Sequence, residues 1–272
     1  MRRTTLLALA AGTLAAGVTP AALAMPAAEF QSSASGSYYY SLGATSGSLS
    51  TSESDITGSL VTVGASKNGY GFDANAESAN GQFKAYAATT HNPADASGYG
   101  YSYANANASF TDFVSFQGGS GTGVASFLSM LNGTLTGGRS GNAGYSLGVS
   151  LYEVDTYEWG YNLGASQALA SDNRSIYGRQ KVSVNDTFET EFDFEYGKTY
   201  AIVANFGLSA SDGGIADFSH TASFAMSAAE GTTLVSSAGI NYGIAAAVPE
   251  PETYAMLLAG LGMLSLIARR RN

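Results

Sequence analysis

The feature that most constrains the fold is a strict two-residue alternation over residues 188–196. One set of positions holds Phe188, Thr190, Phe192, Phe194 and Tyr196, and the other holds Glu189, Glu191, Asp193 and Glu195. Because successive side chains of a strand point to opposite faces, this pattern predicts a strand with one apolar and one acidic face. A Gly-Lys pair and a second strand-like segment, 199–206, follow directly, so we expect the two strands to form a hairpin.

Other strand-like segments recur at short spacing along the chain. They span residues 59–63, 71–76, 82–89, 99–110, 113–116, 124–131, 145–154, 181–184, 217–226 and 234–244. Turn signals separate them, at Asn68-Gly69, Asn80-Gly81, Gly118-Gly119, Asn132-Gly133, Gly137-Gly138 and 212–214. Residues 31–60 are rich in Ser, Gly and Thr, and we expect a frayed start there. No stretch before Pro249 has the periodicity of an amphipathic helix of ten or more residues. The pattern predicts an all-β domain at 25–247, an antiparallel β-sandwich of the jelly-roll type.

The N-terminal segment has the three parts of a secretory signal peptide. Two arginines, Arg2 and Arg3, precede an apolar run over 6–18, and small residues stand at Ala22 and Ala24. We therefore expect residues 1–24 to form a signal-peptide helix that is cleaved after Ala24. Export machinery is the partner that this prediction requires.

The C-terminal segment, 248–272, combines a proline-rich start, a short apolar run and a basic end. The segment begins with Pro249-Glu250-Pro251. Because proline cannot continue a helix interior, we expect a helix to begin after Pro251. The apolar run at 255–268 would be about 21 Å long as a helix, against a hydrocarbon core of about 30 Å. Arg269, Arg270 and Arg271 should stay in the cytoplasm by the positive-inside rule. The run is therefore predicted to be a single transmembrane helix that leaves residues 25–247 outside.

Residues 248–271 resemble the sorting signal of the PEP-CTERM family. The resemblance implies that an exosortase, a membrane-embedded processing enzyme, recognises Pro249-Glu250-Pro251 and removes the tail. Carriers of the signal are typical of Gram-negative bacteria that make exopolysaccharide and biofilm. A Phe-rich strand, a turn and a Thr-Tyr strand at 188–200, together with residues 108–112, also resemble the sandwich cargo of that family.

Composition excludes several classes of function. Between the two ends lie seven basic and nineteen acidic residues, a net charge of −12, which disfavours nucleic acid as a partner. The chain has no cysteine, so disulfides, thiolate metal sites and a cysteine nucleophile are excluded. No P-loop, nucleophile elbow or dinucleotide-binding glycine pattern appears in the required context. We expect no cofactor.

The remaining candidates for chemistry are few. The four carboxylates Glu189, Glu191, Asp193 and Glu195 could supply two ligands for Ca²⁺ or form a solvated strand face. Asp212-Gly213-Gly214 with Asp217 is a second calcium candidate or a turn, and Glu153, Asp155 and Glu158 around Trp159 could contain a glycosidase-like pair. His91 and His220 lack a metal-binding partner nearby in sequence, and we expect structural or surface roles.

Alternating tyrosines at Tyr99, Tyr101 and Tyr103 allow two interpretations. They could stack on sugars, or they could belong to the core of the sheet, and the core is the expectation. The function predicted from the whole sequence is a non-enzymatic exported protein of the exopolysaccharide or biofilm matrix, anchored transiently and then released to the cell surface or medium. The alternatives are a secreted carbohydrate-active enzyme and a calcium-dependent, carbohydrate-binding adhesin.

Overall fold

The computed structural model describes residues 25–79, 81–92, 99–157 and 160–243, and these residues contain strands but no helix. The strands are β1 (Glu29–Leu42), β2 (Thr45–Asp55), β3 (Val61–Lys67), β4 (Tyr70–Ala79), β5 (Gln82–Thr90), β6 (Tyr99–Gln117), β7 (Thr122–Thr136), β8 (Asn142–Tyr157), β9 (Gly160–Tyr177), β10 (Lys181–Glu195), β11 (Thr199–Ser211), β12 (Ile215–Ala228) and β13 (Thr233–Ser236). The prediction of an all-β fold is confirmed for the described residues, and the predicted helices at 1–24 and 255–268 lie outside them.

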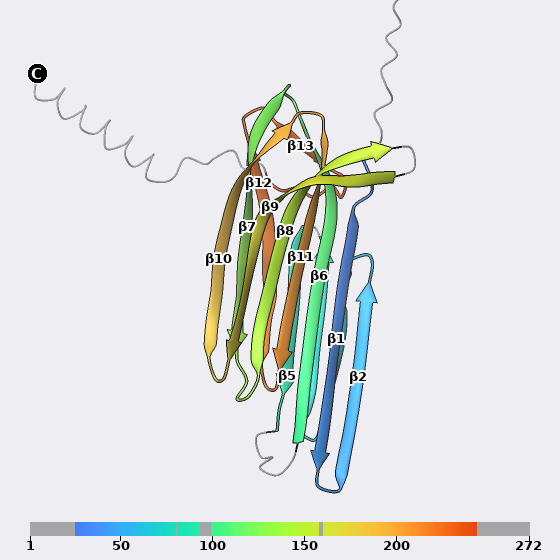
Figure 1. Cartoon of the computed structure of the whole chain (residues 1–272), viewed down its shortest axis with the longest axis vertical. Coiled ribbons are helices and arrows are strands. Elements are labelled where there is room, and N and C mark those ends of the chain that lie inside the picture. Colours follow the sequence, from blue (N-terminus) through green and yellow to red (C-terminus); the bar gives the residue numbers. More distant parts are fainter. Residues whose placement is uncertain (1–24, 80, 93–98, 158–159, 244–272) are drawn as a thin grey trace, which may run out of the picture.

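The strands form two antiparallel sheets that pack face to face (Figure 1). Sheet A has the order β2-β1-β6-β11-β8-β9, with β13 paired to β6, and sheet B has the order β10-β7-β12-β5-β4-β3. From β5 to β12 the chain alternates between the sheets, except at the β8–β9 hairpin, which is the strand order of a jelly roll. Two further hairpins, β1–β2 and β3–β4, widen the two sheets.

The core between the sheets is built from aromatic rings and small residues. The ring of Phe83 in sheet B packs against Phe110 and Phe206 in sheet A, with centroid distances of 5.3 and 6.1 Å. Alanines occupy many of the remaining buried positions. Rings from one sheet therefore fill the space that small residues of the other sheet leave.

The expectation of a frayed start at 31–60 is wrong, because β1 and β2 occupy most of it. Along β1, small residues alternate with serines, and Tyr38 and Tyr40 continue the buried side. The small residues are required by their partner: a Cβ at Gly36 would lie 2.1 Å from the ring of Phe72. Glycine and serine carry no hydrophobic signal, so the sequence pattern did not reveal this strand.

The predicted hairpin of residues 188–206 is also wrong. The alternation itself is confirmed, since Phe192 and Phe194 are buried and the carboxylates are exposed. However, β10 pairs with β7 at the edge of sheet B, and β11 lies between β6 and β8 inside sheet A. The apolar β11 takes a central position, whereas the acidic face of β10 suits an edge. The turn at Gly197, with a φ of 82°, therefore crosses from one sheet to the other.

Some predicted turns and strand limits agree with the structure and others do not. The Asn68-Gly69 turn is confirmed, with positive φ at both residues. In contrast, Gly133 lies inside β7, where a Cβ would come within 2.4 Å of the Phe218 ring. The segments 99–110 and 113–116 are one strand, β6, and 181–184 joins 188–195 as β10. Strand β9 was not predicted, because this edge strand buries few apolar residues.

Candidate functional site

A buried carboxylate binds the last described residues to the sandwich. Asp112 of β6 is 0% exposed. Its Oδ2 accepts hydrogen bonds from the hydroxyls of Ser236 (2.7 Å) and Tyr242 (2.9 Å). Its Oδ1 accepts from the hydroxyl of Ser237 (3.1 Å) and the backbone N–H of Ala238 (3.0 Å). We call Asp112 and residues 236–242 the latch.

The latch satisfies a group that would otherwise be expensive to bury. An ionised carboxylate loses several kcal/mol of hydration inside a protein unless donors replace the water. Burial and the neighbouring Asp112 charge raise the pKa of the Tyr242 phenol, so Tyr242 remains a donor. The Tyr242 carbonyl also accepts the N–H of Met226 (3.0 Å), and the N–H of Ser237 donates to the carbonyl of Phe113 (2.8 Å). The chain is therefore fixed as far as Tyr242.

The latch lies at the same end of the sandwich as the start of β1. Figure 1 shows β13 and the first residues of β1 together at the upper end, while the β1–β2 turn lies at the lower end. In sequence, Pro249 is the seventh residue after Tyr242. The predicted processing residues Pro249, Glu250, Pro251, Arg269, Arg270 and Arg271, and the signal residues Ala22 and Ala24, lie outside the described residues.

The acidic strand face has an ordinary solvated geometry. Glu189, Glu191 and Asp193 are exposed on β10, and their cross-strand partners on β7 are Leu128, Ser126 and Val124 rather than further ligands. Glu195 instead pairs with Lys198 at 2.7 Å. Within the described ranges, no group of three or more His, Asp and Glu side chains is placed to hold a metal ion.

Of the other candidate carboxylates, two accept hydrogen bonds from backbone N–H groups and two are exposed on β8. Asp212 accepts the N–H of Ser102 at 2.8 Å, and Asp217 accepts the N–H of Ser219 at 3.1 Å. Glu153 and Asp155 are exposed on β8, whereas Glu158 and Trp159 are outside the described residues.

The histidine that can be placed has a packing role. His91 packs edge-on against the Tyr70 ring, with a centroid distance of 5.1 Å, and its Nδ1 lies 3.6 Å from Asp212. The side chain of His220 is outside the description.

One polar cluster joins the edges of the two sheets. The Tyr145 hydroxyl donates to Asp172 and, at 3.4 Å, to Asp186, and Arg174 lies 3.3 Å from Asp186. Burial, followed by the hydrogen bond to Asp172, raises the pKa of the Tyr145 phenol. Because both carboxylates already have protein partners, this cluster closes the sandwich between β8, β9 and β10.

The alternating tyrosines are exposed, so their assignment to the core is wrong. Tyr99, Tyr101 and Tyr103 have exposed fractions of 71, 45 and 41%. They lie on the outer face of sheet A together with Tyr39, whose ring is 5.8 Å from that of Tyr101 and stacked on it. The core interpretation failed because residues 102, 104 and 106 of the same strand, which are small, face inward. We call Tyr39, Tyr99, Tyr101 and Tyr103 the tyrosine platform.

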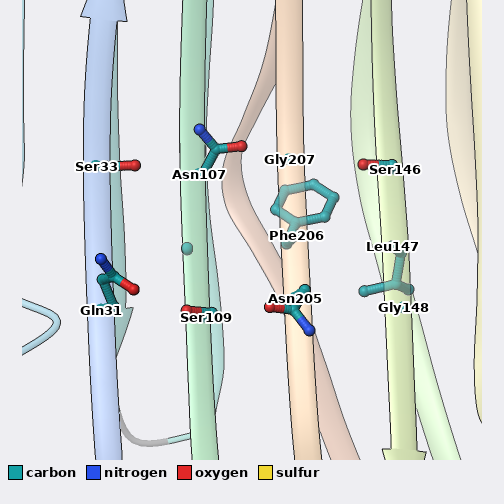
Figure 2. A pocket seen from close by; sticks show the side chains of 11 residues that line it. Gln31, Ser33, Asn107, Ser109, Ser146, Leu147, Gly148, Asn205, Phe206 and Gly207 are labelled. Carbon is teal, nitrogen blue, oxygen red and sulfur yellow. The ribbon is translucent and has the colours of Figure 1, made fainter. Parts of the chain in front are cut away.

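Next to the platform, the outer face of sheet A carries three cross-strand rows of uncharged residues. The rows are Gln31-Ser109-Asn205-Gly148-Ser171, Ser33-Asn107-Gly207-Ser146-Asn173 and Ser35-Asn105-Ser209-Gly144-Ser175. Figure 2 shows the first four members of each of the first two rows side by side, with Phe206 and Leu147 between them. We call these rows the neutral face. Sequence reasoning missed it, because only strand order and register bring five separate segments together.

Two open hollows lie on the neutral face. One has a volume of about 500 Å³ and is bordered by Gln31, Asn205 and Gly148. The other, of about 280 Å³, is bordered by Asn105, Gly144 and Asn173. Asn107, Ser146 and Gly207 border both, so the hollows form one trough across the sheet.

Comparison with known proteins identifies one segment of the chain. The family model of the PEP-CTERM protein-sorting motif matches residues 247–271. No curated protein matches the chain. In the part of the chain that the structure describes, no helix is long and apolar enough to cross a membrane. The matched motif implies export and processing at a membrane, and the chain is therefore a protein with a PEP-CTERM sorting motif, of the kind that exosortases sort.

Proposed function

We propose that this protein is a non-enzymatic component of an extracellular exopolysaccharide or biofilm matrix. It is exported by its signal peptide, held in the membrane by residues 255–268, and released when an exosortase cuts near Pro249-Glu250-Pro251. The observation that carries the proposal is the sorting motif at 247–271, which follows the latch within a few residues.

The latch supports this order of events. Residues 243–248 separate the fixed Tyr242 from Pro249, and six extended residues reach about 20 Å. A linker of this length would hold the latch end of the sandwich close to the membrane, and proline disfavours helix in itself and in the residue before it, which suits an extended recognition segment. The start of β1, which follows the signal peptide, is at that same end.

Two features support a binding role rather than catalysis. The polar cluster of Tyr145 and its two aspartates is occupied by internal hydrogen bonds. The trough on sheet A is bordered by amides, hydroxyls, glycines, apolar residues and Arg174, with no carboxylate among them. General acid and base catalysis of sugar transfer uses a pair of carboxyl groups, and the residues of the trough supply none.

Two variants test the sorting role. Replacement of Pro249-Glu250-Pro251 by alanines should leave insertion intact and block release, so that full-length protein accumulates in the membrane fraction. Replacement of Arg269, Arg270 and Arg271 by glutamines should instead weaken retention and mix the orientations. Immunoblots of membrane and medium fractions distinguish the two results. Release of the alanine variant at the wild-type level would refute the recognition role.

A further inference from the structure

The amide side chains of the neutral face have no hydrogen-bond partner among the described residues. Among the described residues, the side chains of Gln31, Asn105, Asn107, Asn173 and Asn205 make no hydrogen bond to another protein group. Each of these amides offers both a donor and an acceptor to solvent or a ligand. The serines of the rows add hydroxyls with the same dual capacity. The face therefore matches a ligand that is itself covered with hydroxyl groups.

The shape of the face selects an extended ligand. The two hollows are open and continuous, and they cross β1, β6, β11, β8 and β9. At about 4.8 Å between neighbouring strands, the trough is roughly 20 Å long. The floor is open at Gly148, where a Cβ would meet no atom within 4 Å. An open trough of this length suits a stretch of polymer better than a small molecule, which buries most of its surface in a closed pocket.

The tyrosine platform extends the trough along β6. The outward positions of that strand are, in order, Tyr99, Tyr101, Tyr103, Asn105, Asn107 and Ser109. Aromatic faces carry partial negative charge, which attracts the C–H groups on the flat side of a sugar ring. A single ligand polymer could then stack on the platform and form hydrogen bonds in the trough.

Charge decides the class of polymer. None of the residues in the three rows is charged. Arg174, which also borders the second hollow, is paired with Asp186 at 3.3 Å. In contrast, the outer face of sheet B carries Asp73, Glu77, Asp217 and the acidic strand β10. The net charge of −12 between the two ends repels an anionic chain, and a cationic chain would prefer the carboxylates of sheet B. We propose that the neutral face and the tyrosine platform bind an extended, neutral polysaccharide. This inference deepens the proposed matrix role, on which its biological setting rests.

Affinity electrophoresis of the chain, as recovered from the producing cells, tests the inference. Native gels contain hydroxyethyl cellulose, dextran, laminarin or galactomannan as neutral probes and alginate as an anionic probe. At least one neutral polymer should retard the wild type, and alginate should not. Absence of retardation by all four neutral polymers, or stronger retardation by alginate, would overturn the proposal.

Matched variants locate the site. Gly148→Val fills the trough at an open position and should weaken binding by about tenfold or more. The control, Gly64→Val, fills an exposed strand position on sheet B where the nearest atoms are 3.5 Å away, and it should bind as the wild type does. Asn107→Asp should weaken binding, and Asn132→Asp, which adds the same charge to sheet B, should not. Equal binding by Gly148→Val and the wild type would refute the site. The assay does not depend on processing, so failure of binding leaves the sorting role standing, and failure of sorting leaves binding standing.

Discussion

The two faces of sheet A use the same residue types for opposite purposes. On the inner face, Gly36 makes room for the Phe72 ring, and the Asp112 carboxylate accepts four hydrogen bonds from within the protein. On the outer face, Gly148 borders open space, and the Asn107 side chain makes no hydrogen bond to any described residue. Polar groups that are satisfied internally hold a structure together, whereas exposed and unsatisfied ones remain available for a partner. The inner face therefore stabilises the fold, whereas the outer face is the one we propose binds a partner.

The largest expected effect is at the buried carboxylate. Asp112→Ala leaves several buried donors without an acceptor, and we expect the free energy of unfolding to fall by about 3–5 kcal/mol. Urea denaturation measures this loss, and limited proteolysis should cut within 236–243 first. The exposed Asp193→Ala is the control and should change stability by no more than about 0.5 kcal/mol. If both variants unfold alike, the latch does not hold the chain.

A pair of glycine variants compares the two faces directly. Gly36→Val forces a branched side chain into the Phe72 ring and should cost about 1–3 kcal/mol or more. Gly148→Val has open space and gains strand propensity, so its stability should match or slightly exceed that of the wild type. Thermal unfolding of both variants measures the change in melting temperature relative to the wild type. Similar losses of stability would mean that the outer face is not open.

The latch also predicts a response to alkaline pH. Burial raises the pKa of the phenols of Tyr242 and Tyr145 in the folded protein, whereas both titrate near 10 when unfolded. Protons then leave the unfolded state first, so stability is complete below pH 10 and falls above it, by about 1.4 kcal/mol per pH unit for each group. Tyr242→Phe should reduce the slope of stability against pH above 10. An unchanged slope would show that Tyr242 is not protected by burial.

The smallest expected effect on stability is at the tyrosine platform. Tyr101→Ala removes an exposed, stacked ring and should change the free energy of unfolding by about 0.5 kcal/mol or less. Retardation by the neutral polymer should nevertheless decrease. Tyr86→Ala, on the outer face of sheet B, is the control for the loss of a partly exposed ring. Equal retardation of the two variants would remove the platform from the binding surface.

The sequence predicted the elements whose apolar residues alternate with polar ones, such as Phe192 and Phe194 on β10. It did not predict strands whose buried side consists of small residues. Gly36 and Ala34 carry little hydrophobic signal, and the reason for the small size of Gly36 is the Phe72 ring packed against it across the core. The sequence also could not predict that β10 and β11 belong to different sheets, because strands that follow one another along the chain need not pair with each other. The neutral face depends on the register of five strands and could not be assembled from the sequence. The sorting motif, a continuous segment, was recognisable from its residues alone.

The most direct test of the account is the intact mass of the protein released into the medium, with both ends mapped by mass spectrometry. The account predicts a chain that begins at Met25 and ends near Pro249-Glu250-Pro251, and that lacks residues 255–272. It also predicts that the latch residues 236–242 are retained in full. A released protein that still carries Arg2-Arg3 or the arginines at 269–271 would contradict it.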